Sequence, residues 1–358
     1  MRRLIIERSA IRSNMAVIKE RAQGAALYGV VSGQGGGVGA VRLARLLRDA
    51  GVTRFGVNSV EEAQLLRESG FETEEILMLR STVDREELER LVDLSAVCTV
   101  SSVDTGLALN AVAENRSTVA EAHIQVDTGL GFGGFLISEP EKILLAYRSL
   151  PNVALSGIYT QLHAVTGKSQ EVDGQLKQFQ QVLEAIHQAG FETGTVHAAG
   201  SFALMHFDCA RLDAVRARVG HSGPVPPHKR GHGLTTVGYG EATITEVRWL
   251  PKGHTVGADK LITNAKGPPG WPLLPVGYQN GLGGAPQKPG PAGHVAGLAA
   301  QPQPHRAPQR PAGAGYRLHR SLGNHLECHR CEMLRRGRGR LRPGPPLRPG
   351  HAHRISDK

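Results

Sequence analysis

The chain has 358 residues and a formal net charge of +10, a length that fits one large barrel or two ordinary domains. Its apolar runs are too short to span a bilayer and its start lacks the pattern of a signal peptide, so we expect a cytoplasmic protein with no membrane partner. The charge is uneven, because residues 259–358 hold 16 basic and 4 acidic residues whereas residues 1–258 hold 26 and 28. Two regions of different composition therefore meet near residue 258.

Short apolar runs alternate with amphipathic stretches through residues 1–235, beginning with a strand at Arg3–Glu7 and a helix at about Ala10–Arg21 with Ser9 as its cap. Eight further runs have the continuous apolar character of strands buried on both faces: Ala26–Val31, Arg54–Asn58, Ile76–Arg80, Ala96–Val100, Ala122–Val126, Ala154–Thr160, Gly194–Ala198 and Asp213–Val219. Helices are expected between several of them: Val41–Ala50, Val60–Ser69, Arg85–Val92 after the cap Asp84, and Gln175–Ala189. Eight such units predict a closed α/β barrel, a (β/α)8 barrel of the TIM type, with an open doubly wound sheet as the alternative.

Residues 236–258 have the pattern of the start of a second, β-rich domain. Glu241–Trp249 and His254–Val256 read as strands, and Pro251-Lys252-Gly253 supplies a turn, so we expect a β-hairpin. The pattern then fails, because residues 259–358 hold 15 of the 21 prolines and few β-branched or aromatic residues. Such a segment cannot bury enough apolar surface to offset its ordering entropy. The sequence therefore predicts a truncated or disrupted β-domain followed by a disordered tail.

The tail contains two features with a chemical interpretation. Cys328 and Cys331 have the spacing of half a zinc site, but a second ligand pair at standard spacing is missing, so we predict no metal site. The run Arg335–Arg342 could contact nucleic-acid phosphates, but it has no interleaved aromatic residues, and nucleic acid is not an expected partner. Because Arg, Pro, Gly and Ala have GC-rich codons, our hypothesis is a shifted reading frame, lost near Ala258 and regained briefly around Leu273.

Motif-like segments lie in a fixed order along the barrel region: Leu27-Tyr28-Gly29-Val30-Val31, Phe55-Gly56-Val57-Asn58-Ser59-Val60-Glu61-Glu62-Ala63, Val126-Asp127-Thr128-Gly129-Leu130-Gly131, Ser156-Gly157-Ile158-Tyr159-Thr160, His197-Ala198-Ala199-Gly200-Ser201 and Leu212-Asp213-Ala214-Val215-Arg216. The ordered set resembles the alanine racemase family over roughly residues 3–257. The resemblance implies a fold-type-III barrel with pyridoxal phosphate at its C-terminal mouth, a small amino acid as substrate, and a homodimer. In that family a lysine joins the cofactor as an imine, and this lysine and a tyrosine exchange the substrate's proton.

The chain departs from the family where this chemistry is performed. Ser32 stands at the position of the Schiff-base lysine, and Ala258-Asp259-Lys260 stands where the catalytic tyrosine should follow Thr255-Val256-Gly257. Further replacements are Gly36 for a tyrosine that contacts the phosphate, Gln125 for a lysine of many members, Phe132 for the arginine at the ring oxygen, Gln161 for a histidine and Gly200 for an asparagine. A hydroxyl cannot form a Schiff base. We therefore expect no retained catalytic residue, no covalently held cofactor and no racemase activity.

Two residues could still contact the cofactor according to the resemblance. Ser201 could donate to a phosphate, and Arg216 matches the arginine that faces the pyridine nitrogen, although it could equally pair with Asp213 at the rim. Two residues later, Arg218 falls where the family has a glycine whose backbone helps to hold the phosphate. One alternative function is therefore a non-enzymatic binder of a phosphorylated ligand at the barrel mouth, using Ser201 and Arg216.

Another alternative is a nucleotide-dependent enzyme that uses the loop Gly33–Gly39. Gly35-Gly36-Gly37-Val38-Gly39-Ala40 satisfies a dinucleotide-binding pattern, and Glu61 lies at a distance along the chain that suits a ribose contact. The pattern arises easily in a run so rich in glycine. We therefore favour the interpretation of this loop as a flexible strand–helix connection that has lost its side chains.

Overall fold

The computed structural model describes residues 2–163, 169–218, 233–235, 237–249, 251 and 253–256, and then the segments 262–263, 270–273, 275, 315–321, 325–327 and 353–356. The chain divides into two compact units. One is Ile11–Thr235, and the other combines Met1–Ala10 with Thr236–Lys358. Among the described helices, none is long and apolar enough to cross a membrane.

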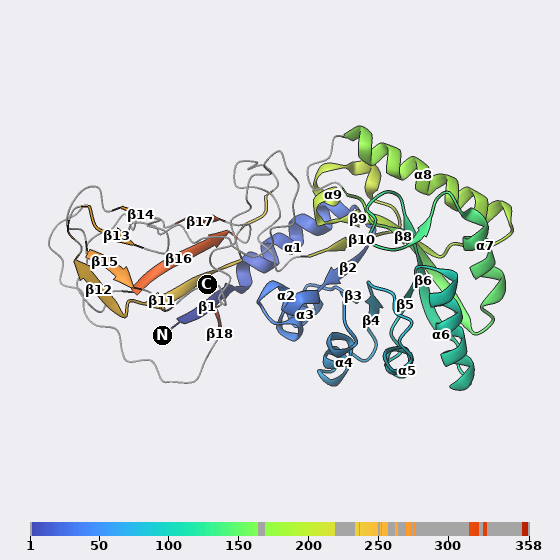
Figure 1. Cartoon of the computed structure of the whole chain (residues 1–358), viewed down its shortest axis with the longest axis horizontal. Helices are drawn as coiled ribbons and strands as arrows, with labels where there is room; N and C mark the ends of the chain where they lie inside the picture. The colour runs from blue at the N-terminus through green and yellow to red at the C-terminus, as the bar shows by residue number, and fades with distance from the viewer. Residues whose placement is uncertain are drawn as a thin grey trace. The chain divides into compact units, whose positions relative to one another are not determined.

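Eight parallel strands form a barrel in the unit Ile11–Thr235 (Figure 1). Their order around the barrel follows the chain: β2 (Ala26–Val30), β3 (Arg54–Val57), β4 (Glu75–Met78), β5 (Cys98–Val100), β6 (Ala120–Asp127), β8 (Val153–Thr160), β9 (Thr195–Gly200) and β10 (Ala214–Ala217), with the short β7 (Phe135–Leu136) beside β6. The row closes between β4 and β5, where Leu77 and Val97 form a parallel bridge. The amide of Met78 donates to the carbonyl of Val97 at 2.9 Å. This closure confirms the predicted (β/α)8 barrel and excludes the open sheet.

Helices follow the strands along the chain, and those labelled α4 to α8 lie outside the barrel in Figure 1. Their bounds are α1 (Arg8–Ala22), α2 (Ser32–Gly36), α3 (Ala40–Asp49), α4 (Val60–Glu68), α5 (Arg85–Asp93), α6 (Val103–Asn115), α7 (Pro140–Ser149), α8 (Ser169–Gln188) and α9 (Ser201–His206), with a 3-10 turn at Asp208–Ala210. Asp84 caps α5 as predicted, because its carboxylate accepts from the Glu87 amide at 2.8 Å. The predicted cap Ser9 is wrong, since α1 already begins at Arg8.

A glycine on β8 makes room for a buried histidine in the barrel interior. A Cβ atom placed on Gly157 would lie 2.6 Å from Nε2 of His123, whose side chain is buried. We expect Gly157→Ala to lower the free energy of unfolding by about 1–3 kcal/mol, the usual cost of overpacking a core, as measured by urea denaturation. Gly174→Ala on α8 is the matched control, because its Cβ would meet no atom within 4 Å. Equal stability of the two variants would contradict this account.

The second unit contains a sheet in the order β17-β16-β11-β1-β18. Its central strand β11 (Gly238–Thr243) is antiparallel to β1 (Arg2–Glu7), and the Arg3 guanidinium pairs with the Glu241 carboxylate across them at 2.5 Å. The remaining strands of the sheet are β16 (Gly315–Ser321), β17 (His325–Glu327) and β18 (His353–Ser356). These three strands fall in the region of low strand propensity and were not predicted from the sequence. Cys328, Cys331 and Arg335–Arg342 lie outside the described residues.

The predicted β-hairpin of Glu241–Trp249 with His254–Val256 is wrong. The first range divides into β11 and β12 (Glu246–Trp249), and β12 pairs with β15 (Gly270–Leu273). The second range contributes β13 (Thr255–Val256), which pairs with β14 (Ile262–Thr263). Alternation located the strands but not their partners, because both partners come from beyond residue 258, where no strand was expected.

Candidate functional site

Three residues that follow barrel strands are linked to one another at the C-terminal rim. Ser32 comes just after β2, Ser201 after β9 and Arg218 after β10. The Ser32 side chain is fully buried, and its hydroxyl oxygen accepts from Nη2 of Arg218 at 2.8 Å. The Ser201 hydroxyl oxygen accepts from the backbone amide of the same arginine, also at 2.8 Å. The structure thus brings the predicted residues Ser32 and Ser201 together through Arg218, a contact that the sequence did not reveal.

Arg216 is buried inside the barrel, and its partners lie there too. Its Nη1 group contacts Nδ1 of His197 at 2.5 Å, and Nη2 donates to the carbonyls of Thr160 at 2.7 Å and Ala198 at 3.3 Å. The guanidinium carbon lies 4.8 Å from the centre of the Tyr159 ring, at a cation–π distance. Burial lowers the pKa of Arg216 to about 10, so the group remains a cation at neutral pH.

The pairing of Arg216 with Asp213 that the sequence left open is wrong. The Asp213 carboxylate instead accepts from the amide of Val196 at 2.9 Å, and Asp213 is exposed. Asp213 directly precedes β10, three positions before Arg216, and an odd separation in extended backbone points two side chains to opposite faces. Arg216 therefore carries a buried positive charge with no carboxylate partner among the described residues.

Two buried histidines extend the contacts of Arg216 into the barrel. A guanidinium can only donate, so Nδ1 of His197 accepts and its Nε2–H donates to Nδ1 of His123 at 2.9 Å. His197 is stacked between the rings of Tyr28 and Tyr159, at centroid distances of 5.3 and 4.9 Å. Burial, with the nearby positive charges, lowers the pKa of His123 to about 4 and also lowers that of His197. Both rings are therefore neutral at pH 7. His123 was missed, although its alternation with apolar neighbours in β6 places it on the inner face.

Gln125 and Phe132 are the residues expected from the resemblance to stand at positions of a lysine and an arginine. Gln125 makes contacts within the barrel, and Phe132 is exposed. The Gln125 amide nitrogen donates to the carbonyl of Gly133 at 3.2 Å, and its oxygen accepts from the Tyr159 hydroxyl at 3.4 Å. Gln125 thereby ties the loop after β6 to the barrel wall. Phe132 in that loop is 82% exposed and offers no polar group to a ligand. Gln161, which the resemblance places at the position of a histidine, is likewise exposed.

The backbone amides of the glycine loop after β2 already donate to a carboxylate of the protein. Gly33, Gln34 and Gly35 have left-handed φ angles of 66°, 55° and 58°, a tight turn in which glycine is favoured. One oxygen of Glu62 accepts from the Gly33 amide at 2.7 Å and from the Gln34 amide at 3.4 Å. These amides would have to be free to cradle a pyrophosphate. Their occupation by an anion therefore counts against the nucleotide-binding alternative.

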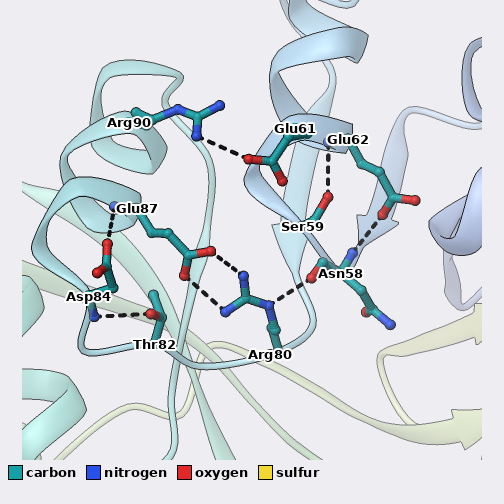
Figure 2. Close-up of polar contacts among 9 residues, drawn as sticks. All are labelled: Asn58, Ser59, Glu61, Glu62, Arg80, Thr82, Asp84, Glu87 and Arg90. Atoms are coloured by element: carbon teal, nitrogen blue, oxygen red, sulfur yellow. Dashed lines mark hydrogen bonds and ion pairs between the residues drawn. The ribbon is translucent and has the colours of Figure 1, made fainter.

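Figure 2 shows how the neighbouring carboxylates are used. The second oxygen of Glu62 accepts from the amide of Asn58 at 3.0 Å, while the Ser59 hydroxyl accepts from the amide of Glu62 as the cap of α4. Glu61, the proposed ribose contact, is exposed and bound by Arg90 at 3.0 Å. Glu61 and Glu62 thus point to different partners, and both serve the fold.

A second arginine fixes the rim between β3 and β4. Arg80 donates from Nε to the carbonyl of Asn58 at 2.8 Å, and its two terminal nitrogens contact both oxygens of Glu87 at 3.0 and 2.5 Å (Figure 2). A bidentate pair of this kind constrains both side chains. Among the residues described here, this part of the mouth is therefore held by internal contacts, and the charge of Arg80 is paired.

The donor set that the described residues place at the mouth does not fit a covalently held pyridoxal phosphate. The covalent link requires a side-chain amine, and the described lysines are Lys19, Lys142 and Lys177, which belong to helices α1, α7 and α8. Lys19 donates to the carbonyl of Ala50, and Lys142 donates to Glu139. Within the described residues, no lysine follows a barrel strand. A cluster of residues able to hold a metal ion is also absent from the described part of the chain.

Comparisons with known proteins identify relatives of the chain. The family described as alanine racemase, N-terminal domain, matches residues 6–222. An alanine racemase of Carboxydothermus hydrogenoformans is 30% identical over 281 residues, which are 76% of this chain and 74% of the relative. The solved alanine racemase of Streptomyces coelicolor is 26% identical with a TM-score of 0.68, covering 78% of this chain and 76% of that one. The alanine racemase of Bartonella henselae, solved with covalently bound pyridoxal phosphate, shares the fold at 23% identity with a TM-score of 0.68, over 78% of this chain and 76% of that one.

Proposed function

The chain belongs to the alanine racemase family, and from that premise we propose that it is a member that neither links pyridoxal phosphate covalently nor racemises alanine. One observation carries the proposal. Directly after β2 lies the fully buried hydroxyl of Ser32, which accepts a hydrogen bond from Arg218. This is the position at which the family's lysine is expected. A hydroxyl supplies neither the covalent link nor a base at neutral pH.

The polar interior supports the same proposal. A proton relay at the mouth would need a group that titrates near neutral pH. His197 and His123 lie buried behind Arg216, and the pKa values of both are lowered. Their nitrogens are engaged with each other and with Arg216. These side chains hold the barrel's core and do not replace the two missing bases.

The first test is chemical trapping of the cofactor. We expect that incubation with pyridoxal phosphate and borohydride leaves no single barrel lysine stoichiometrically modified by a pyridoxyl group, because Ser32 has no amine. Peptide mass spectrometry after digestion measures this directly for every lysine of the chain. A pyridoxyl group on one barrel lysine at a stoichiometry near one would contradict the proposal. Labelling that disappears on denaturation before reduction separates a specific link from scattered surface reaction.

A second candidate function is a non-enzymatic binder of a phosphorylated ligand at the barrel mouth. It is favoured by Ser201, whose oxygen accepts from the Arg218 amide and whose own hydroxyl hydrogen is left for a ligand. Arg216 contributes less directly than the sequence predicted, since both of its terminal nitrogens already have partners inside the barrel.

We further propose that residues 259–358 form a region that is dispensable for the barrel, because the barrel unit Ile11–Thr235 contains its own closed sheet. Limited proteolysis of the full chain should cut beyond about residue 257 first and leave a stable fragment that contains residues 11–235. Intact-mass analysis over time measures the order of cuts. Protection of residues 290–358 while the barrel is cut would refute this proposal. The same fragment in a sizing column reports whether a homodimer needs the second unit.

A further inference from the structure

We infer that the outer face of helices α6 and α7 is an interface at which two copies of this chain associate about a twofold axis. Four side chains define this face, and they are Leu107 and Glu114 on α6 and Leu145 and Arg148 on α7. Both helices lie outside the barrel (Figure 1). The inference goes beyond the proposed function, because none of the four residues belongs to the barrel mouth.

Helical spacing points these four side chains away from the barrel. Residues two apart on a helix are separated by about 200° around its axis, so they lie on nearly opposite sides. Each of the four stands two residues from a buried member of its own helix, these members being Leu109, Val112, Ile143 and Ala146. All four side chains are accordingly exposed, and a second molecule can reach them.

The face contains two exposed leucines on neighbouring helices. Leu107 and Leu145 are 46% and 47% exposed. The helices pack side by side, since a Cβ atom placed on Gly106 of α6 would lie 2.8 Å from the side chain of Leu150, which follows α7. Among the described residues of the flanking helices α5 and α8, no large apolar side chain is exposed. Exposed apolar surface is thus concentrated on α6 and α7, and its burial against a second molecule is favourable.

The charges of the face indicate a second copy of the chain as the partner. Glu114 and Arg148 have no ion pair among the described residues, whereas Arg85 on the neighbouring α5 pairs with Glu89 at 2.7 Å. The acidic side chain lies on α6 and the basic one on α7. A twofold axis parallel to the helices places α6 of each copy against α7 of the other, so each Glu114 faces an Arg148. An axis perpendicular to the helices would place α6 against α6 and bring like charges together.

The charges near the start of the two helices are compatible with this arrangement. Asp104 belongs to α6, and Lys142 of α7 contacts Glu139 of its own chain at 2.7 Å. The hydrogen bond with Glu139 raises the pKa of Lys142, and the charges of Glu141 and Asp104 add to this effect. Glu141, the one acidic residue of α7, is therefore offset by Lys142 within its own chain.

The experiment is sedimentation velocity of the full-length protein at low salt over a range of concentrations. We expect reversible dimers with a dissociation constant of about 10–100 μM, because the face is small and exposed ion pairs contribute little. Arg148→Glu or Glu114→Arg alone should weaken association by about fivefold or more, since each places like charges together at two symmetry-related contacts. The double variant, Glu114→Arg with Arg148→Glu, should recover association, because the same contacts form again with their charges exchanged.

Arg45→Glu is the matched control. Arg45 is exposed on α3 and has no ion pair among the described residues, so this variant makes the same charge change elsewhere and should associate as the parent does. Replacing Leu107 and Leu145 together by glutamine should also weaken association. The inference is overturned if the parent stays monomeric up to about 1 mM, an affinity too weak for a specific dimer. It is also overturned if the Arg45 and Arg148 variants weaken association equally, or if the double charge exchange does not recover it. None of these results changes the outcome of borohydride trapping, so the two proposals can fail separately.

Discussion

Purified protein mixed with pyridoxal phosphate is expected to convert L-alanine to D-alanine no faster than the cofactor alone. Racemisation in this family requires a covalent anchor and two bases on opposite faces of the substrate, and a positioned general base by itself contributes about 10²–10⁴-fold. On our proposal, Ser32 stands in place of the anchor and of one base. The second base is not found after Thr255-Val256-Gly257 either. Chiral chromatography of the product, with cofactor alone as the blank, measures the rate.

The variant Ser32→Lys tests the loss of the covalent anchor separately from the loss of the second base. Restoring the amine should permit a covalent link that absorbs in the visible and disappears on borohydride reduction. It should not restore much turnover if, as we propose, the second base is also missing and Phe132 stands in place of an arginine. A saturable excess rate in the unmodified protein that vanishes in Arg216→Ala would show that the chain is an enzyme. Some residue interpreted above as structural would then have to supply the base.

Acidification is expected to remove about 3 kcal/mol of stability between pH 6.5 and 4 through His123 alone, the free-energy equivalent of lowering its pKa from 6.5 to about 4. The folded state binds the proton more weakly than the unfolded chain does. The stability is therefore fully present above pH 6.5, is lost as the pH falls toward 4, and does not change further below that value. The cause is burial first, followed by the charges of Arg216 and Arg54. Urea denaturation across this pH range measures the loss.

His123→Gln provides the control for that pH dependence. Glutamine can keep a hydrogen bond with His197 but cannot titrate, so the variant should lose stability less steeply between pH 6.5 and 4. Protonation of His197, whose pKa is also lowered, adds to the slope in both proteins. Carboxylates elsewhere contribute equally to the two proteins and cancel in the difference. An unchanged slope would mean that His123 is not buried as a neutral ring.

The barrel was predictable because each strand carries its own signal. The apolar runs at Ala26–Val31 and Arg54–Asn58 became β2 and β3 within a residue or two, since strands buried on both faces need continuous apolar residues. Helix α6 was not predicted, because Gly106 interrupts its pattern. That glycine is required by packing, since a Cβ there would lie 2.8 Å from Leu150. Helix α7 was not predicted either, so the local pattern located the barrel strands more completely than the helices.

The chemistry of the site was less predictable, because it depends on which side chains meet across the barrel. Ser32 and Ser201 could be placed at strand ends from the sequence, but Arg218, which joins them, could not be assigned a partner. The interpretation of Arg216 as a rim ion failed for the same reason. Whether a strand residue points inward or outward is set by a register of one residue, and alternation was not visible in so short a strand as β10.

The place where the barrel closes is also where it is weakest. Between β4 and β5 the strands share a single bridge, whereas β3 and β4 pair over four positions. A side chain supplements this seam, because the Thr99 hydroxyl donates to the carbonyl of Met78 at 2.6 Å. If thermal motion parts the seam, the cylinder becomes an open sheet with two unpaired edges. Unpaired edges recruit strands from other molecules. Aggregation during heating would therefore begin from β4 and β5 while the rest of the barrel is still folded.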